Sequence, residues 1–368
     1  KKKGKVDVIY IDPPYNIGGK NFKYNDDYVK KDDSFKHSYW LSFMSVRLRI
    51  ARLLLKEDGY IFVSINDMEH AQLKMLMDEI FGENCFVAQL TWESTTQPTN
   101  TGKAKFKIQK KTEPIYVYAK NTNKKRQFLL EEADNKLKYP HDGKFGKCRF
   151  EIIEKSDSGA YKRNTMKYEI LGQKPREGKR WQIGEETARD LEKRGRIEIV
   201  DGIVKKAVYP EDEIEKISYI PFWSLLNAKD VDTAQSGKEE LNTMLGYSVG
   251  FDTVKSVKLM KAIFSHFAND ILVLDFFAGS GTTGQAIMEM NSEDGGRRRF
   301  ILCTDNEENI CEDITYKRLK VSIKGENELG IKYGNPNPSN LLYYKTDYIK
   351  KRKDDENYNA SKKNPIEV

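Results

Sequence analysis

The apolar positions of this chain form short runs that alternate with longer repeats of helical spacing. Runs rich in β-branched residues at 6–11, 60–65 and 271–275 have the length and composition of buried strands. Apolar residues recur at helical spacing over 39–56 and again over 68–80. Strands that alternate with helices in this way predict an α/β fold with a doubly wound, mostly parallel sheet.

The same pattern predicts the remaining elements of the sheet. Further strands are expected at 86–92, 114–119 and 299–304, and a further helix at 253–267. Asp67 stands immediately before the second helical repeat, which makes it the predicted N-cap of that helix.

The pattern breaks down between residue 120 and about residue 246. Short alternating runs at 196–200 and 203–208 lie among turns rich in Gly, Lys and Asp, and aromatic residues are interleaved with Lys and Arg. We expect an inserted, irregular or β-rich module, in which the aromatic residues either stack on nucleic-acid bases or form the module's own core. The predicted organisation is a first core half at 1–120, the inserted module at 121–245, a second core half at 246–330 and a partly loose C-terminal extension at 331–368.

Charge adds a candidate binding surface. The 368-residue chain has a net charge of +7, and the stretch from Gly102 to Arg126 holds nine Lys and Arg residues against the single acid Glu113. Such a stretch is typical either of contact with a polyanion or of a solvated surface. The candidate DNA-binding residues are Lys103, Lys105, Lys107, Lys110, Lys111, Lys124, Lys125 and Arg126.

The rest of the composition narrows the class of protein. The four cysteines show no C-x-x-C spacing and the four histidines are scattered, so neither a metal site nor a disulfide framework is predicted. Because no stretch has the length and apolarity of a membrane span or signal peptide, we expect a cytoplasmic protein. The chain begins abruptly beside a buried strand, and we therefore expect an N-terminal portion outside it.

The first strand ends at Asp12-Pro13-Pro14-Tyr15, which is the first candidate site. Proline has no N–H to donate, so the pair ends the strand and leaves carbonyl groups free to accept hydrogen bonds. Acceptors beside a flat ring suit a planar molecule that is held by an exocyclic amino group and stacked on the tyrosine. An ordinary strand end with a structural tyrosine is the alternative.

The second candidate site follows the strand at 271–275. Gly279, Gly281 and Gly284 satisfy G-x-G-x-x-G between a strand and a helix, which lets a ligand approach the backbone and the helix N-terminus. Asp275 suits a ligand ammonium group, and Asp305, after the next strand, suits ribose hydroxyls. A ligand with an amine and a carboxylate, such as the methionine end of S-adenosylmethionine, fits both features. A tight strand–turn–helix without a ligand is the alternative.

If the two strands are neighbours, Asp12 faces the glycine loop, and a methyl group passes in line from a sulfonium to an amine. An adenine amine is a poor nucleophile because its lone pair is delocalised into the ring. Acceptors at Asp12 and Pro13 favour its rehybridisation as the new bond forms.

Together, Asp12-Pro13-Pro14-Tyr15 and Phe277-Ala278-Gly279-Ser280-Gly281 resemble the motifs of β-class adenine-N6 DNA methyltransferases. The likeness is closer to the modification (Mod) subunits of type III restriction-modification systems, and it extends over residues 60–69, 80–83, 116–121 and 299–304. The resemblance implies a circularly permuted, Rossmann-like methyltransferase fold with a target-recognition module. It also implies double-stranded DNA as substrate, with a restriction (helicase-nuclease) subunit and a second copy as partners.

The resemblance assigns roles to individual residues. Asp12, Pro13, Pro14 and Tyr15 would bind the flipped target adenine. The residues that would bind S-adenosylmethionine are Asp275, Phe277, Ala278, Gly279, Ser280, Gly281, Thr282, Phe251, Thr253, Lys255 and Asp305. Val254 stands where the family usually has a proline in Phe-x-x-Pro-Lys.

Four other functions are alternatives to this prediction. A cytosine amino-methyltransferase more often begins its motif with Ser than with Asp. A cytosine-carbon methyltransferase needs a nucleophilic Cys that usually follows Pro, and it is excluded because none of the four cysteines follows a proline. A catalytically silent DNA-recognition subunit would suit a chain that lacks an upstream part of the cofactor pocket. A nicotinamide-dependent dehydrogenase would use the glycine loop but leave Asp12–Tyr15 unexplained.

Overall fold

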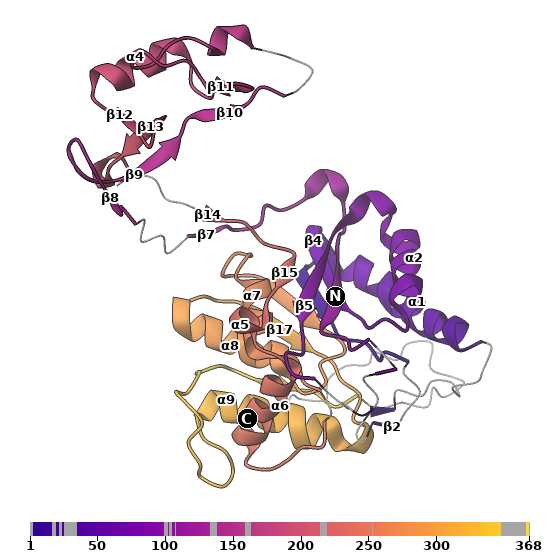
Figure 1. Ribbon diagram of the computed structural model, residues 1–368. Helices are drawn as coiled ribbons and strands as arrows, with labels where there is room; N and C mark the ends of the chain where they lie inside the picture. The colour runs from indigo at the N-terminus through magenta and orange to yellow at the C-terminus, as the bar shows by residue number, and fades with distance from the viewer. Residues whose placement is uncertain are drawn as a thin grey trace, which may run out of the picture. The chain divides into compact units, whose positions relative to one another are not determined.

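A computed structural model of the chain describes residues 3–16, 35–98, 102, 105–106, 108–132, 138–158, 163–213, 219–251 and 253–346, and the backbone alone at 20–21, 24–25 and 366–367. The chain divides into two compact units (Figure 1). The core unit comprises residues 1–129 and 222–368, and the inserted unit comprises residues 130–221.

The core unit is built on a seven-stranded sheet with the order β15-β5-β6-β4-β1-β16-β17. Its strands are β1 (Val6–Ile11), β4 (Leu55–Ser64), β5 (Phe86–Glu93), β6 (Thr112–Ala119), β15 (Leu225–Leu226), β16 (Leu272–Asp275) and β17 (Arg299–Leu302). β1 is parallel to both β4 and β16, and parallel pairs also join β16 to β17 and β15 to β5. β6 runs antiparallel to β4 and β5, so the sheet is mixed but mostly parallel, as predicted.

Helices cover both faces of this sheet, α1 and α2 on one side and α7 and α8 on the other (Figure 1). The helices of the core unit are α1 (Lys36–Leu54), α2 (His70–Phe81), α5 (Ala228–Val231), α6 (Ala234–Leu245), α7 (Val257–Phe264), α8 (Thr282–Asp294) and α9 (Tyr316–Lys324), with a π-helical turn at Ile310–Thr315.

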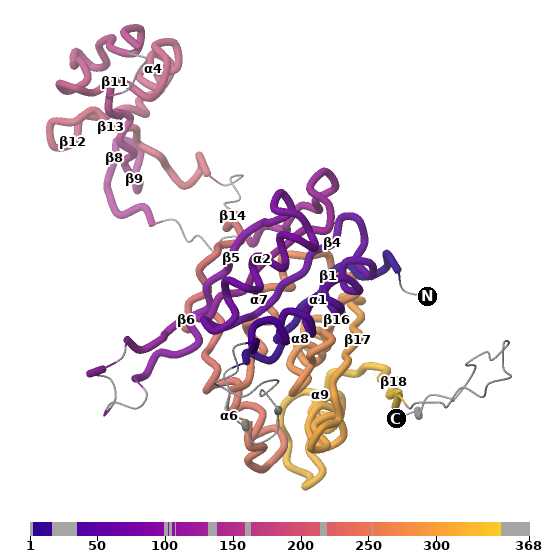
Figure 2. Tube along the Cα trace, turned by 90° about the vertical axis from the view of Figure 1, so that its right-hand side faces the viewer, coloured from indigo at the N-terminus to yellow at the C-terminus, as the bar shows by residue number. Residues whose placement is uncertain are grey.

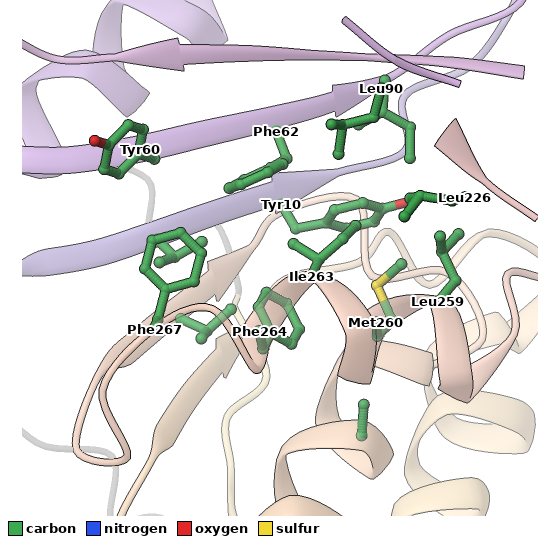
Figure 3. Packing of buried hydrophobic residues seen from close by; sticks show 14 of the residues in the cluster. Tyr10, Tyr60, Phe62, Leu90, Leu226, Leu259, Met260, Ile263, Phe264 and Phe267 are labelled. Carbon is green, nitrogen blue, oxygen red and sulfur yellow. The ribbon is translucent and has the colours of Figure 1, made fainter. Parts of the chain in front are cut away.

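Alternate residues of each strand pack on opposite faces of the sheet, because successive side chains of a strand point in opposite directions. In β1, Val8 and Tyr10 belong to the cluster that includes α7, whereas Ile9 and Ile11 belong to the cluster that includes α1 and α2. Figure 3 shows the first face, where Tyr10 lies above residues of α7 such as Met260. The apolar stripe of each helix therefore fixes which way the strand residues at the carboxyl end of β1 must point.

Two local predictions are wrong. β4 begins at Leu55 rather than residue 60, because Leu55 already has extended backbone angles and pairs with Val6 of β1. α2 begins at His70 and not beside Asp67, which instead forms an ion pair with Lys110 at 3.3 Å. The turn before α2 is closed by Asn66, whose side-chain oxygen accepts the N–H of Met68 at 2.9 Å.

The inserted unit is rich in β-structure and has its own core, in which Trp181, Ala188 and Val204 are buried together. Its elements are β7 (Glu131–Glu132), β8 (His141–Gly143), β9 (Gly146–Ile152), β10 (Glu154–Ser156), β11 (Lys179–Trp181), α4 (Glu185–Lys193), β12 (Ile197–Val200), β13 (Ile203–Val208) and β14 (Tyr219–Ile220). β12, β13, β9 and β8 form a four-stranded sheet. The unit is narrower than the predicted span of 121–245, because β15 pairs with β5 and α6 packs against α9 in the core unit.

The C-terminal extension is described as far as residue 346. It contains β18 (Leu342–Tyr343), which pairs with β19 (Ile366–Glu367), and most of the tail predicted to be loose lies outside the described residues. Short β2 (Lys20–Asn21) and β3 (Tyr24–Asn25) pair with each other. In the described part of the chain, no helix combines the length and apolarity needed to cross a membrane.

Asp7 fastens the amino end of β1 to its neighbours. Its buried carboxylate accepts hydrogen bonds from Lys56 Nζ at 2.7 Å, Arg126 Nη2 at 2.6 Å and the backbone N–H of Leu272 at 2.9 Å. Burial would raise the pKa of Asp7, but these donors hold it below its usual value. Arg126 is therefore a structural residue, bound at the opposite end of β1 from Asp12.

We expect Arg126→Met to lower the free energy of unfolding by about 2 kcal/mol, because it removes one of two cations from a buried carboxylate. The loss should shrink as the pH falls through the lowered pKa of Asp7, since the protonated acid no longer needs a cation. Urea denaturation measures both effects. Lys124→Met, at an exposed neighbouring position, is the matched control and should leave stability unchanged. Equal stabilities of the two variants would contradict this role.

Candidate functional site

The ends of β1 and β16 bring the two predicted motifs together. Ile9 of β1 lies beside Leu274 of β16 in a parallel pair, so Asp12 and Asp275 leave the sheet at the same edge. The two carboxyl groups are close enough for the charge of Asp12 to raise the pKa of Asp275. The carboxyl ends of adjacent parallel strands are the usual place for a ligand in an α/β fold.

The loop after β1 is anchored to α1 and to the residue that precedes α2. Pro13 and Pro14 are buried, and the carbonyl of Pro14 accepts a hydrogen bond from Trp40 Nε1 of α1 at 2.7 Å. Asn16 follows with a left-handed φ of 57°, and its amide donates to Glu69 Oε1 at 2.7 Å. These contacts hold the Asp12–Tyr15 backbone in one conformation, which a recognition loop requires.

Four polar side chains meet directly beyond this strand end. The hydroxyl of Tyr15 donates to Asp12 Oδ1 at 2.5 Å. Lys255 Nζ lies 3.2 Å from Asp12 Oδ2, 2.8 Å from the Tyr15 oxygen and 3.0 Å from Glu113 Oε2. Glu113 Oε2 is also 3.4 Å from the Tyr15 hydroxyl. We call Asp12, Tyr15, Glu113 and Lys255 the strand-end cluster.

The charges of the strand-end cluster compensate one another. Burial would lower the pKa of Lys255, but Asp12 and Glu113 reverse this and raise it. Burial would likewise raise the pKa of Glu113, and Lys255 reverses it, so this pKa is lowered. Burial and the two neighbouring carboxylates raise the pKa of Tyr15 well above its usual value. The cluster therefore holds an ammonium and a protonated phenol beside the carboxyl groups of Asp12 and Glu113.

Sequence reasoning did not assign Glu113 to the site, and it gave Lys255 a cofactor role alone. In the structure the ammonium group of Lys255 contacts Asp12 and Glu113, and its carbonyl faces the glycine loop, where it accepts from Thr282 Oγ1 at 3.2 Å. Close packing sets this position: a Cβ on Gly237 of α6 would come within 2.5 Å of the carbonyl oxygen of Val254. Glu113 lies 142 positions before Lys255, and no local signal links them.

The glycine loop turns sharply between β16 and α8. Gly279 and Gly281 have left-handed φ values of 48° and 82°, which residues with a side chain rarely adopt. The carbonyl of Gly279 accepts a hydrogen bond from Thr315 Oγ1 at 2.6 Å. The loop therefore presents its backbone to the same edge of the sheet as Asp12.

A buried arginine, which sequence reasoning missed, lies against this loop. Arg318 Nη1 donates to Ser280 Oγ at 3.0 Å and to Thr282 Oγ1 at 2.8 Å, and Nε donates to Gln285 Oε1 at 2.7 Å. Burial lowers its pKa. A guanidinium beside the N-terminus of α8 adds positive charge where the helix already favours an anion.

Asp275 has the opposite character. It is 3% exposed and accepts hydrogen bonds from Thr283 Oγ1 at 2.6 Å and from the N–H of Phe277 at 3.1 Å. Burial raises its pKa to about 7 against the action of both donors, and the charge of Asp12 adds to the rise. Among the residues that the structure describes, no Lys or Arg pairs with it. A buried acid without a cation fits a ligand ammonium group.

The other predicted cofactor residues surround the loop less closely. Ala278 is buried, Phe277 is half-buried and packs against Phe43 of α1, and Phe251 packs in a cluster between α6 and α9. Thr253 is exposed, and so is Asp305. Asp305 follows β17, which borders β16, so it lies at the same edge of the sheet.

The predicted basic stretch does not form one patch. Lys105, Lys110 and Lys111 precede β6, whereas Lys124, Lys125 and Arg126 follow it; Lys103 and Lys107 lie outside the described residues. The two ends of an eight-residue strand are about 25 Å apart, so the two groups of basic residues lie beyond opposite ends of the strands. Because β6 is antiparallel to β4, its start lies at the Asp12 edge, where the preceding residues project from the sheet (Figure 2).

Within the described residues, no three His, Cys, Asp or Glu side chains are grouped as metal ligands. The strand ends instead hold hydrogen-bond acceptors and a flat ring on one side. On the other side lie an acid that no described Lys or Arg pairs with, a glycine loop and a buried arginine.

Comparison with known proteins agrees with this geometry. Residues 6–317 match the family model described as DNA methylase, a family that uses S-adenosylmethionine. The chain is 32% identical over 333 residues to the Mod subunit of the type III restriction-modification enzyme StyLTI of Salmonella typhimurium (81% of this chain, 49% of that one). It is 33% identical over 367 residues to the EcoPI Mod subunit of Escherichia phage P1 (83% and 55%).

A third relative comes from a different type of restriction-modification system. The type II methyltransferase M.KpnI of Klebsiella pneumoniae is 32% identical over 338 residues, which cover 85% of this chain and 78% of that one. The chain spans about half the length of the two Mod subunits.

We expect Asp275 to make stability fall as the pH rises. Its pKa is about 7 in the folded chain and about 4 in the unfolded one, so between these values the unfolded chain alone has released the proton. Urea denaturation at about pH 5 and about pH 8 should show a smaller fall for Asp275→Asn than for the wild type. Asp270→Asn, at an exposed position before β16, is the matched control. Parallel pH profiles for wild type and Asp275→Asn would contradict the assignment.

Proposed function

Because the chain belongs to the DNA methylase family, we propose that it is the modification polypeptide of a restriction-modification system, which methylates the exocyclic amino group of a flipped adenine in duplex DNA. The observation that carries the proposal is the placement of Asp12 and Asp275 at the ends of adjacent parallel strands. One end offers acceptors for an amine, and the other offers an uncompensated acid for an ammonium group.

The Asp12–Tyr15 loop receives the base. Asp12 and the carbonyl of Pro13 accept hydrogen bonds from the target amine, since the carbonyl of Pro14 is already bound to Trp40. Acceptors fixed in place before the reaction stabilise the charge that develops on the nitrogen as the bond forms. The ring of Tyr15 stacks on the base, which replaces part of the stacking that flipping removes.

The glycine loop receives the cofactor. S-adenosylmethionine supplies an activated methyl group on a sulfonium. Asp275 binds the ammonium of its methionine end, and the N-terminus of α8, reinforced by Arg318, attracts the carboxylate. Asp305 is placed to accept from the ribose hydroxyls. The remaining contacts come from Phe251, Thr253, Lys255, Phe277, Ala278, Gly279, Ser280, Gly281 and Thr282.

Adenine is the proposed target because the motif begins with an acid. The Asp12 carboxyl group lies beside the ammonium of Lys255 and has two oxygens that can accept hydrogen bonds, whereas the Ser usual in cytosine amino-methyltransferases has one hydroxyl. The order of the motifs, with Asp12–Tyr15 before Asp275–Thr282, supports the proposal that the chain has the circularly permuted arrangement.

The inserted unit is the proposed target-recognition module, because aromatic side chains are interspersed among basic ones along it. Its exposed members would contact the DNA, while Trp181 belongs to its core. The relatives are named as Mod subunits of restriction-modification enzymes, which supports a restriction subunit as a partner. We also propose a second copy of the chain as a partner and a cytoplasmic location.

We expect Asp12→Ala to reduce methyl transfer at least about 100-fold, because it removes a fixed acceptor from the transition state. The assay combines tritiated S-adenosylmethionine with unmethylated genomic DNA and identifies the labelled nucleoside. Isothermal titration calorimetry should show cofactor binding close to the wild-type value. Turnover retained by Asp12→Ala would exclude its role.

The same assay on the wild type distinguishes the competing functions. Label in methyladenine supports the proposal, and label in methylcytosine supports a cytosine amino-methyltransferase. DNA binding without transfer would identify a silent recognition subunit.

The divided basic stretch makes a separate prediction. Lys105, Lys110 and Lys111 replaced together by Gln should weaken DNA binding and lower the salt slope of log Kobs by roughly one for each phosphate that the protein no longer neutralises. Lys124→Gln with Lys125→Gln, at the other end of β6, is the matched control and should keep the wild-type slope. Fluorescence anisotropy over a NaCl series measures both. Equal slopes for the two variants would remove the first group from the interface.

A further inference from the structure

Both oxygens of Asp12 have partners in the structure. Oδ1 accepts from the Tyr15 hydroxyl at 2.5 Å, and Oδ2 faces Lys255 Nζ at 3.2 Å. The proposed reaction needs the same carboxylate for the target amine and the same tyrosine ring for stacking. The Tyr15 hydroxyl therefore competes with the substrate for Asp12, and it needs another acceptor when the base arrives, since a buried hydroxyl without a partner is costly.

Glu113 stands where that acceptor is required. Its Oε2 is 3.4 Å from the Tyr15 hydroxyl, within reach after a shift of a few tenths of an ångström. Lys255 Nζ at 3.0 Å and the hydroxyl of Ser94 hold this carboxylate, which is 15% exposed, at the start of β6. Lys255 lies between the two acids and contacts both, so it can stay bound while the hydroxyl moves from one to the other.

We propose that Glu113 is a positioning residue, which accepts the Tyr15 hydroxyl when the target amine takes its place on Asp12. The exchange keeps every polar group of the strand-end cluster paired, and it frees Tyr15 to lie over the base. This inference rests on the proposed function, because the event that drives the exchange is the arrival of the base.

A purely structural role makes a different prediction. If Glu113 served only to neutralise Lys255, any carboxylate at this position would suffice. Glu113→Asp separates the two roles, since it keeps the negative charge near Lys255 but withdraws the carboxylate by one methylene from the Tyr15 hydroxyl. Glu113→Gln removes the charge and keeps the length.

The experiment measures kcat and KM for DNA with tritiated S-adenosylmethionine. The variants are Glu113→Asp, Glu113→Gln, Tyr15→Phe and the double variants with Tyr15→Phe. Glu57→Gln, on an exposed glutamate paired with Lys120, is the matched control. Urea denaturation of each variant reports its stability.

We expect both substitutions of Glu113 to lower kcat/KM for DNA about tenfold, including Glu113→Asp at near wild-type stability. In the Tyr15→Phe background neither Glu113→Asp nor Glu113→Gln should lower kcat/KM further, because the hydroxyl whose hydrogen bond Glu113 accepts is absent. Cofactor affinity should stay at the wild-type value throughout.

Full activity of Glu113→Asp, or an equal loss with and without the Tyr15 hydroxyl, would overturn the inference and leave the proposed function intact. A wild-type chain that transfers no methyl group would overturn the proposed function and the inference with it.

Discussion

The buried ammonium of Lys255 is the contact on which the site depends. It joins the acid that ends β1 to an acid that begins β6, and its own carbonyl is bonded to the loop that begins α8. Three segments far apart in the sequence therefore share one residue. Removing one charge from such a buried group leaves the others uncompensated, which costs far more than an exposed ion pair would. The strand-end cluster is for this reason a single unit, in which each side chain limits the positions of the rest.

The sequence predicts the parts of the fold that local chemistry decides. The strand at 6–11 and the glycine loop are recognisable in the sequence. A run of apolar residues, a proline pair or a G-x-G-x-x-G pattern each predicts local structure from ten or fewer neighbouring residues. The prediction that Asp12 and Asp275 meet at one edge is confirmed by the register of β1 and β16. It follows from a general property of parallel sheets, and so needs no knowledge of other contacts.

Contacts between residues that are distant in the sequence cannot be predicted from local sequence patterns. Glu113 reads as one acid in a basic stretch, and Arg318 as one cation on an amphipathic helix, until the fold places each beside a motif. The direction of β6 decides which of the residues at or near its ends reach the candidate site. A parallel and an antiparallel strand have the same apolar pattern, yet the antiparallel one brings Glu113 to Asp12 and sends Arg126 to Asp7.

The buried acids at the two ends of β1 and its neighbour β16 differ in their partners, and this difference separates a structural role from a proposed functional one. At the amino end, Asp7 has two cations and a backbone N–H, so its charge stabilises the fold. At the carboxyl end, Asp275 of the adjacent strand is just as buried and accepts from two neutral donors among the described residues, so its ionised form is disfavoured. A ligand that brings an ammonium group restores what the protein omits there, and its binding stabilises the fold by mass action. The same pair of strands, β1 and β16, is thus self-sufficient where it only supports the sheet, and incomplete where we propose that the cofactor binds.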